Sequence, residues 1–100
     1  MILEVAILQI KAGLSADFER AFTQATPCIQ GVDGYVSHQL QKCLEADDKY
    51  ILLVKWTTLI AHTEGFRLSA AYQDWKKLLH HFYDPFPVVE HYQLTQGSAD

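Results

Sequence analysis

The sequence predicts an α+β domain in which a four-stranded antiparallel sheet carries two helices on one face. Short apolar runs of strand length alternate along the chain with segments whose apolar residues recur at helical spacing. The order of these segments is βαββαβ. A length of 100 residues leaves room for one hydrophobic core. We therefore expect a single domain over residues 1–95, followed by a polar tail over residues 96–100.

The first element is a strand over residues 2–10. Apolar side chains occupy both of its faces, since Leu3 and Val5 on one side alternate with Ala6 and Leu8 on the other. A strand of this kind needs cover on both faces.

A helix follows from Ser15, which we expect to cap it, with Asp17 in the first turn to suit the helix dipole. Pro27 disfavours the helical conformation at the residue before it, so we expect a kink or a break there before Gly31. The apolar residues at helical spacing form one stripe: Phe18, Ala21, Phe22, Ala25, Ile29 and Val32.

Two further strands are expected over residues 35–43 and Lys49–Trp56, joined by the polar turn 45–48. With a four-residue loop, the numbers of paired residues sum to 93, which places His38 opposite Lys55.

The last third of the chain predicts a short helix over residues 59–66 and a second helix capped by Ser69. The proline-containing turn 84–87 ends this helix, and residues 88–95 form the last strand. The buried stripe of the second helix is expected to contain five residues: Tyr72, Trp75, Leu78, Leu79 and Phe82.

The βαββαβ order is that of the ferredoxin-like fold, which leaves one face of the sheet without helices. Because the first strand is apolar on both sides and the third nearly so, that bare face indicates a partner. A second copy related by a two-fold axis is the simplest partner. We therefore expect a homodimer through the sheet face, with an interface of about 2,000 Å² or more.

Composition and charge exclude several classes of partner. The formal net charge is −4 and the eight Lys and Arg residues are scattered, which argues against nucleic acid. No run approaches the roughly 20 apolar residues of a membrane helix, and the start lacks the features of a signal peptide. Cys28 and Cys43 lack a CxxC spacing, so we expect free thiols and a cytoplasmic protein.

Several short motifs accompany the βαββαβ order: Gly34-Tyr35, Leu53-Val54-Lys55-Trp56, Ala61-His62, Gly65-Phe66-Arg67-x-Ser69, the pair Tyr72 and Trp75, and Pro87-Val88-Val89-Glu90-His91-Tyr92. In these motifs the chain resembles the antibiotic biosynthesis monooxygenase (ABM) domain family of the dimeric α+β barrel superfamily, over about residues 2–95. The resemblance implies a cofactor-independent monooxygenase that oxidises a small aromatic or polyketide-like substrate with dioxygen, without flavin or metal.

The same family leaves other functions open. A non-catalytic small-molecule-binding or stress-response module would use the same pocket, and isomerase or decarboxylase chemistry needs only a base and a dry cavity. In the haem-degrading branch, an asparagine, a tryptophan and a histidine stand where this chain has Ala6, Phe66 and Lys76. None of the three matches, so the resemblance to this branch is weak. His80, one helical turn after Lys76, is the alternative iron ligand through which this chain would bind haem.

Oxygenation of a phenol without a cofactor needs a base of suitable pKa and apolar walls, which favours histidine. His62 is the first candidate, because Leu59 and Phe66 on the same helical face would line a cleft against the sheet. A partly buried histidine bonded to a backbone carbonyl is the structural alternative. His38 is the second candidate, with a nearby Lys55 to keep it neutral.

Aromatic residues are the candidates for binding the substrate. Trp56 would stack on a flat ring or donate its indole N–H, although a core role is the simpler interpretation. Tyr72, Trp75 and Phe66 are expected beside it, with packing as the alternative.

The remaining histidines are weaker candidates. His80 and His81 near a helix C-terminus are expected at the surface. His91 and Glu90 face opposite ways on a strand and form no dyad, so we expect His91 to meet a cross-strand neighbour or the dimer partner. No histidine pair has the spacing of two metal ligands, and we expect no metal.

Overall fold

The computed structural model describes residues 1–97 of the chain. Its elements follow the predicted order: β1 (Ile2–Gln9), α1 (Ser15–Gln30), β2 (Tyr35–Lys42), β3 (Lys49–Trp56), the π-helical segment η1 (Ala61–Phe66), α2 (Ala70–Leu79), the 3-10 turn η2 (His80–Phe82) and β4 (Val89–Gln93). The tail expected over residues 96–100 lies outside the described residues from position 98 on.

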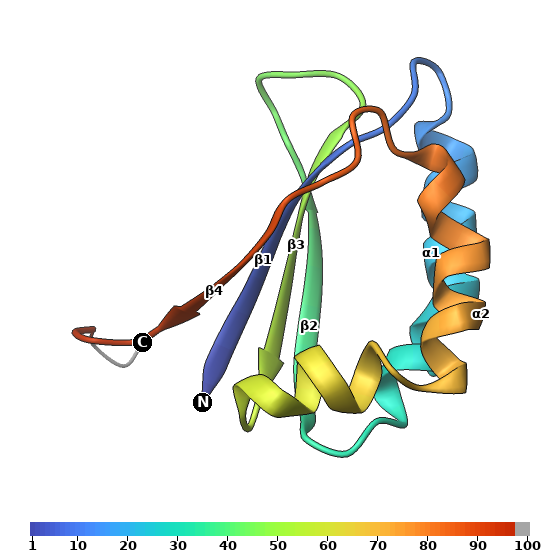
Figure 1. The fold of residues 1–100 in the computed structure, drawn as a ribbon. Coiled ribbons are helices and arrows are strands. Elements are labelled where there is room, and N and C mark those ends of the chain that lie inside the picture. Colours follow the sequence, from blue (N-terminus) through green and yellow to red (C-terminus); the bar gives the residue numbers. More distant parts are fainter. Residues whose placement is uncertain (98–100) are drawn as a thin grey trace.

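The four strands form one antiparallel sheet in the order β2-β3-β1-β4. Figure 1 shows both helices lying against the same face of this sheet, while its other face is bare. The ferredoxin-like α+β prediction is therefore confirmed. Because β1 occupies a central position, its inward side chains meet residues from both β3 and β4.

The predicted hairpin register was wrong by one residue. His38 lies opposite Val54 instead of Lys55, and the backbone N–H of Cys43 bonds to the carbonyl of Lys49 at 2.8 Å. The loop therefore has five residues. Its last residue, Asp48, has a φ of 55° and its carboxylate accepts hydrogen bonds from the start of the α1 region.

The helix α1 begins differently from the prediction and ends before Gly31, as expected. Ser15 is its first residue and not its cap, because its hydroxyl donates to Asp48 Oδ1 at 2.5 Å. The helix continues through Pro27 to Gln30 without a break. The expected helices over 59–66 and after Ser69 are confirmed, and the Ser69 Oγ accepts from the N–H of Tyr72 at 3.2 Å.

The core lies between the sheet and the helices. Its centre is aromatic, with Phe18, Trp56 and Phe66 almost wholly buried. On the bare face, Leu3, Val5 and Leu53 are only partly covered, and Ile7 is 41% exposed. None of the helices in residues 1–97 is long and apolar enough to span a membrane.

Candidate functional site

A cavity of about 360 Å³ lies between the inner face of the sheet and the helical layer. Its floor comes from β1 and β3, and its walls come from η1, α2 and the segment that leads from α2 to β4. Much of the wall is aromatic, and it also carries a carboxyl group, a guanidinium group, two imidazoles and two phenolic hydroxyls. The lining residues are Glu4, Ala6, Leu8, Leu52, His62, Phe66, Arg67, Tyr72, Trp75, His80, Tyr83, Phe86, Pro87 and Val89.

The structure brings four of the six predicted site residues to this cavity: His62, Phe66, Tyr72 and Trp75. The rings of Tyr72 and Trp75 pack edge to face on Phe66, at centroid distances of 5.2 and 5.7 Å. The helical spacing from which they were proposed therefore places them in one wall. Their roles in binding and catalysis stay predictions.

The other two predicted residues do not line the cavity. Trp56 is completely buried behind it and stacks on His62 at 5.2 Å between ring centroids. His38 lies between Phe22 and Tyr35, and its Nδ1 is 2.6 Å from the Tyr35 hydroxyl. With Val54 opposite it, His38 also lacks the expected lysine neighbour.

A buried chain of polar groups runs along one side of the cavity. The indole N–H of Trp56 donates to Glu4 Oε1 at 2.9 Å, and His62 Nε2 lies 3.3 Å from the same oxygen. His62 Nδ1 is 2.7 Å from His91 Nε2. In neutral His62, Nε2 faces Glu4 and Nδ1 shares a hydrogen bond with His91, and one of these two ring nitrogens carries the proton.

The electrostatic environment keeps this chain uncharged at His62. Burial lowers the pKa of His62 to about 3, and the positive charge of Arg67 and the neighbouring His91 act in the same direction. Burial raises the pKa of Glu4, although the Trp56 hydrogen bond and Arg67 oppose that rise. The contact of His62 with Glu4 at 3.3 Å is therefore that of a neutral imidazole and not an ion pair.

Glu4 is the site residue that the sequence analysis missed. Its side chain is 6% exposed, and it points inward with Ala6 and Leu8. A signal was present, because Glu4 is the one charged residue among the alternating apolar residues of the first strand. Among residues 1–97, every fully enclosed side-chain oxygen has a hydrogen-bond partner, whereas Oε2 of Glu4 has none. Oε2 is therefore not enclosed, and it opens to the cavity that Glu4 lines.

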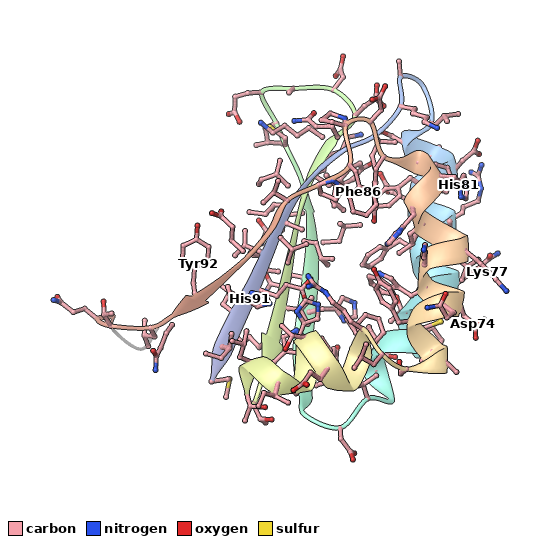
Figure 2. The ribbon with its side chains drawn as sticks, in the orientation of Figure 1. Asp74, Lys77, His81, Phe86, His91 and Tyr92 are labelled. Carbon is pink, nitrogen blue, oxygen red and sulfur yellow. The ribbon has the colours of Figure 1, made fainter. Side chains whose placement is uncertain are left out.

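The surface position expected for His80 was wrong, whereas His81 is exposed. His80 is half-buried in the cavity wall, where its ring contacts Phe86 at 4.9 Å and Tyr72 at 5.8 Å between centroids. Burial lowers its pKa, with Lys76 adding to the effect. In Figure 2, His81 points away from the sheet and Phe86 lies between sheet and helix.

His91 meets a cross-strand neighbour, as the sequence suggested. It pairs with Glu4 across β1 and β4 and reaches His62 on the inner face of the sheet. Figure 2 shows Tyr92, the next residue, pointing away on the bare side. In residues 1–97, no group of three or more His, Cys, Asp or Glu side chains is arranged to hold a metal ion.

The βαββαβ order and the single antiparallel sheet place the protein among the small ferredoxin-like α+β domains. More narrowly, the sequence matches the model of the antibiotic biosynthesis monooxygenase family over residues 1–78. The chain belongs to this family, which confirms the resemblance seen in its motifs. Membership of this family supports monooxygenase activity as a general class and names no substrate.

Two individual proteins are similar to the chain over nearly its whole length. The chain is 59% identical over 93 residues to the uncharacterised protein YczJ of Bacillus subtilis, covering 93% of this chain and 98% of that protein. The crystal structure of a candidate antibiotic biosynthesis monooxygenase from Bordetella bronchiseptica has a TM-score of 0.90 at 35% identity, covering 95% and 97% of the two chains.

A third comparison shows the fold alone. SnoaB, a cofactor-independent oxygenase from Streptomyces nogalater, has a TM-score of 0.85 at 17% identity, covering 99% of this chain and 97% of that one.

Proposed function

We propose that the protein is a cofactor-independent monooxygenase that oxidises a small aromatic or polyketide-like substrate with dioxygen. The observation that carries this proposal is the buried chain of Glu4, His62 and His91 beside an aromatic cavity. Such a site supplies a proton acceptor and excludes water, which are the two requirements of this chemistry. SnoaB, whose fold is similar, is itself a cofactor-independent oxygenase.

The reaction begins when the site removes the proton of a phenol or enol. The resulting anion passes one electron to dioxygen, and the radical pair combines to form a carbon–oxygen bond. Loss of water from this peroxide leaves a carbonyl group on the same carbon. The substrate thereby loses two hydrogens and gains one oxygen atom, while the second oxygen atom leaves as water.

In this proposal Glu4 and His62 act together as the base. Oε2 of Glu4 opens to the cavity and takes the proton, while the hydrogen bond that Oε1 accepts from Trp56 and its contact with His62 hold the carboxyl group in place. Its raised pKa brings the carboxyl closer to the working pH of a general base. Phe66, Tyr72 and Trp75 flank the substrate ring.

Oxygen uptake with a panel of hydroquinones and enolisable polycyclic ketones tests the proposal. We expect uptake with formation of a quinone, a drop of about 10²-fold or more in kcat for Glu4→Gln, and a similar drop for His62→Gln. The exposed His81→Gln is the matched control and should retain full activity. With ¹⁸O₂, one labelled atom should enter the product.

Two results would exclude the monooxygenase. Tight binding of these compounds without any turnover would indicate a binding module. Conversion of substrate without oxygen uptake would indicate isomerase or decarboxylase chemistry at the same base.

We also propose that the protein works as a homodimer through the bare face of the sheet. This face carries the partly covered Leu3, Val5 and Leu53 and the exposed Ile7 and Tyr92. Burial of such a surface is favourable at about 25 cal/mol per Å² of apolar area, and burying it against its own copy satisfies both subunits.

Sedimentation tests the dimer. Leu53→Glu places a charge on the bare face and should give a monomer at micromolar concentration. Gln73→Glu adds the same charge on exposed α2 and should leave the dimer intact. A wild-type protein that sediments as a monomer would refute the proposal.

A cytoplasmic location completes the proposal. Cys28 and Cys43 are both free, as suits a reducing compartment. Cell fractionation of the tagged protein tests this location, and recovery from the culture medium would contradict it.

A further inference from the structure

We propose that the cavity takes an aromatic acid, a phenol or enol of one or two rings whose carboxylate binds Arg67. The proposal rests on the proposed function, because it names the substrate class of the same site. It arises from the charges in the cavity wall, which the oxygenase chemistry itself does not need.

Arg67 is half-buried in the cavity wall at the end of η1. Among residues 1–97, its guanidinium forms no ion pair and its side chain has no hydrogen-bond acceptor. Glu4 lines the same cavity but lies beyond ion-pair distance of it. A half-buried cation loses hydration without gaining a partner, and an anion bound in the cavity would supply that partner.

The charge of Arg67 reaches into the site. Burial has the largest effect on the pKa values around it: it lowers those of His62 and His91 and raises that of Glu4. The positive charge of Arg67 lowers all three pKa values. Because His62 is neutral and burial disfavours the charged form of His80, Arg67 is the one permanent cation among the described residues of the wall.

The other polar groups of the wall are mostly donors. The hydroxyls of Tyr72 and Tyr83 have no hydrogen-bond partner in the described part of the chain and are not sealed off. Burial, together with Tyr72 and Glu4, raises the pKa of Tyr83, which therefore keeps its proton. Within residues 1–97, Glu4 is the only acidic residue that lines this cavity. The wall is thus complementary to a ligand rich in acceptor atoms.

Size and shape narrow the ligand. A volume of about 360 Å³ is near the lower end of small-molecule pockets and suits one or two fused rings. The planar guanidinium binds a carboxylate through two parallel hydrogen bonds. A phosphate dianion would need more positive charge than a single arginine provides. The ligand then presents its carboxylate to Arg67 and its hydroxyl to Glu4.

Calorimetry under anaerobic conditions tests this inference without turnover. The probes are 2,5-dihydroxybenzoate, its methyl ester and an aryl phosphate of the same size. For the wild type we expect the acid to bind about tenfold or more tightly than the ester, since a charge-assisted hydrogen bond is worth that much. Arg67→Gln should remove this preference while leaving binding of the ester unchanged, and Arg67→Lys should keep part of it.

Arg20→Gln removes an exposed arginine that pairs with Asp17, and it should behave as the wild type. Equal binding of acid and ester by the wild type would overturn the inference, as would an acid preference that survives in Arg67→Gln. Tighter binding of the phosphate would overturn the carboxylate assignment. Acid-selective binding without oxygen uptake would refute the oxygenase alone, whereas equal oxidation of acid and ester at matched kcat/KM would refute the substrate class alone.

Discussion

Gly34 is the position where one added methyl group should do the most damage per atom. Its φ of +91° lies in the left-handed region, and its carbonyl accepts the N–H of Thr57 at 2.8 Å. A Cβ built at this position would lie 2.5 Å from the Cβ of Ala61 and 2.9 Å from the Oγ1 of Thr57. Ala61 precedes His62 in η1, so the clash pushes directly on the segment that carries the site.

Gly13 provides the matched control. Its φ is +80°, but a Cβ there would have no atom within 4 Å. Both Gly→Ala variants pay the left-handed backbone penalty of about 1–2 kcal/mol, whereas Gly34→Ala alone adds an overpacking cost of about 1–3 kcal/mol. For a domain of this size, each kcal/mol lowers Tm by roughly 4–8 °C.

We therefore expect Gly34→Ala to melt at least about 4 °C below Gly13→Ala. Calorimetry or circular dichroism measures this difference, at one protein concentration for both variants because a dimer's Tm depends on concentration. Equal melting temperatures for the two variants would refute the reasoning, since they would mean that Gly34 and Ala61 do not pack as closely as described.

Three further predictions concern the site and its supports. His62 has a pKa of about 3 in the fold against an ordinary 6.5, so its contribution is present above pH 6.5 and is lost as the pH falls toward 3. At pH 5 the loss is about 2 kcal/mol. Urea midpoints of the wild type should fall between pH 7.5 and 5 by more than those of His62→Gln, and equal falls would contradict the lowered pKa. The raised pKa of Glu4 changes stability with pH in the opposite direction, but Glu4 is present in both proteins, so its effect cancels in the comparison. Trp56→Phe should cost about 1–3 kcal/mol, because it leaves Oε1 of Glu4 without its indole donor, and an unchanged urea midpoint would count against that bond. Ser69→Ala should lower the free energy of unfolding by about 1 kcal/mol through loss of the cap of α2. Ser69→Asp should retain most of the stability of the wild type in the same urea titration, because aspartate also caps helices.

Local pattern predicted the fold because each element follows its own periodicity. The hairpin register failed for a reason that lies outside the hairpin. Asp48 accepts the hydroxyl of Ser15 and the N–H of Gly13, more than thirty residues away in the sequence. These bonds hold Asp48 in a positive φ and lengthen the loop to five residues. The same contact turns Ser15 away from capping α1, so one tertiary interaction accounts for both errors.

The aromatic wall of the site was also predictable, because residues at helical spacing share a face whatever they pack against. His80 was misplaced since the helix turns into the 3-10 segment at this residue. There the dipole argument for exposure competes with burial against Phe86 and Tyr83. Burial prevails because the segment returning to β4 covers the ring.

The surroundings of Glu4 depend on the strand order, so the sequence indicates that its carboxyl group points inward but not which residues lie beside it. Alternation along β1 is enough to turn Glu4 inward, and a buried carboxyl group requires hydrogen-bond donors. The order β2-β3-β1-β4 places Trp56 of β3, which donates to Glu4, on one side of β1 and His91 of β4, which contacts His62, on the other. His62 then closes the chain from η1. Alternation along β1 turns Glu4 inward, but the sequence alone does not determine the strand order, and only the structure shows that Trp56 and His91 lie beside it.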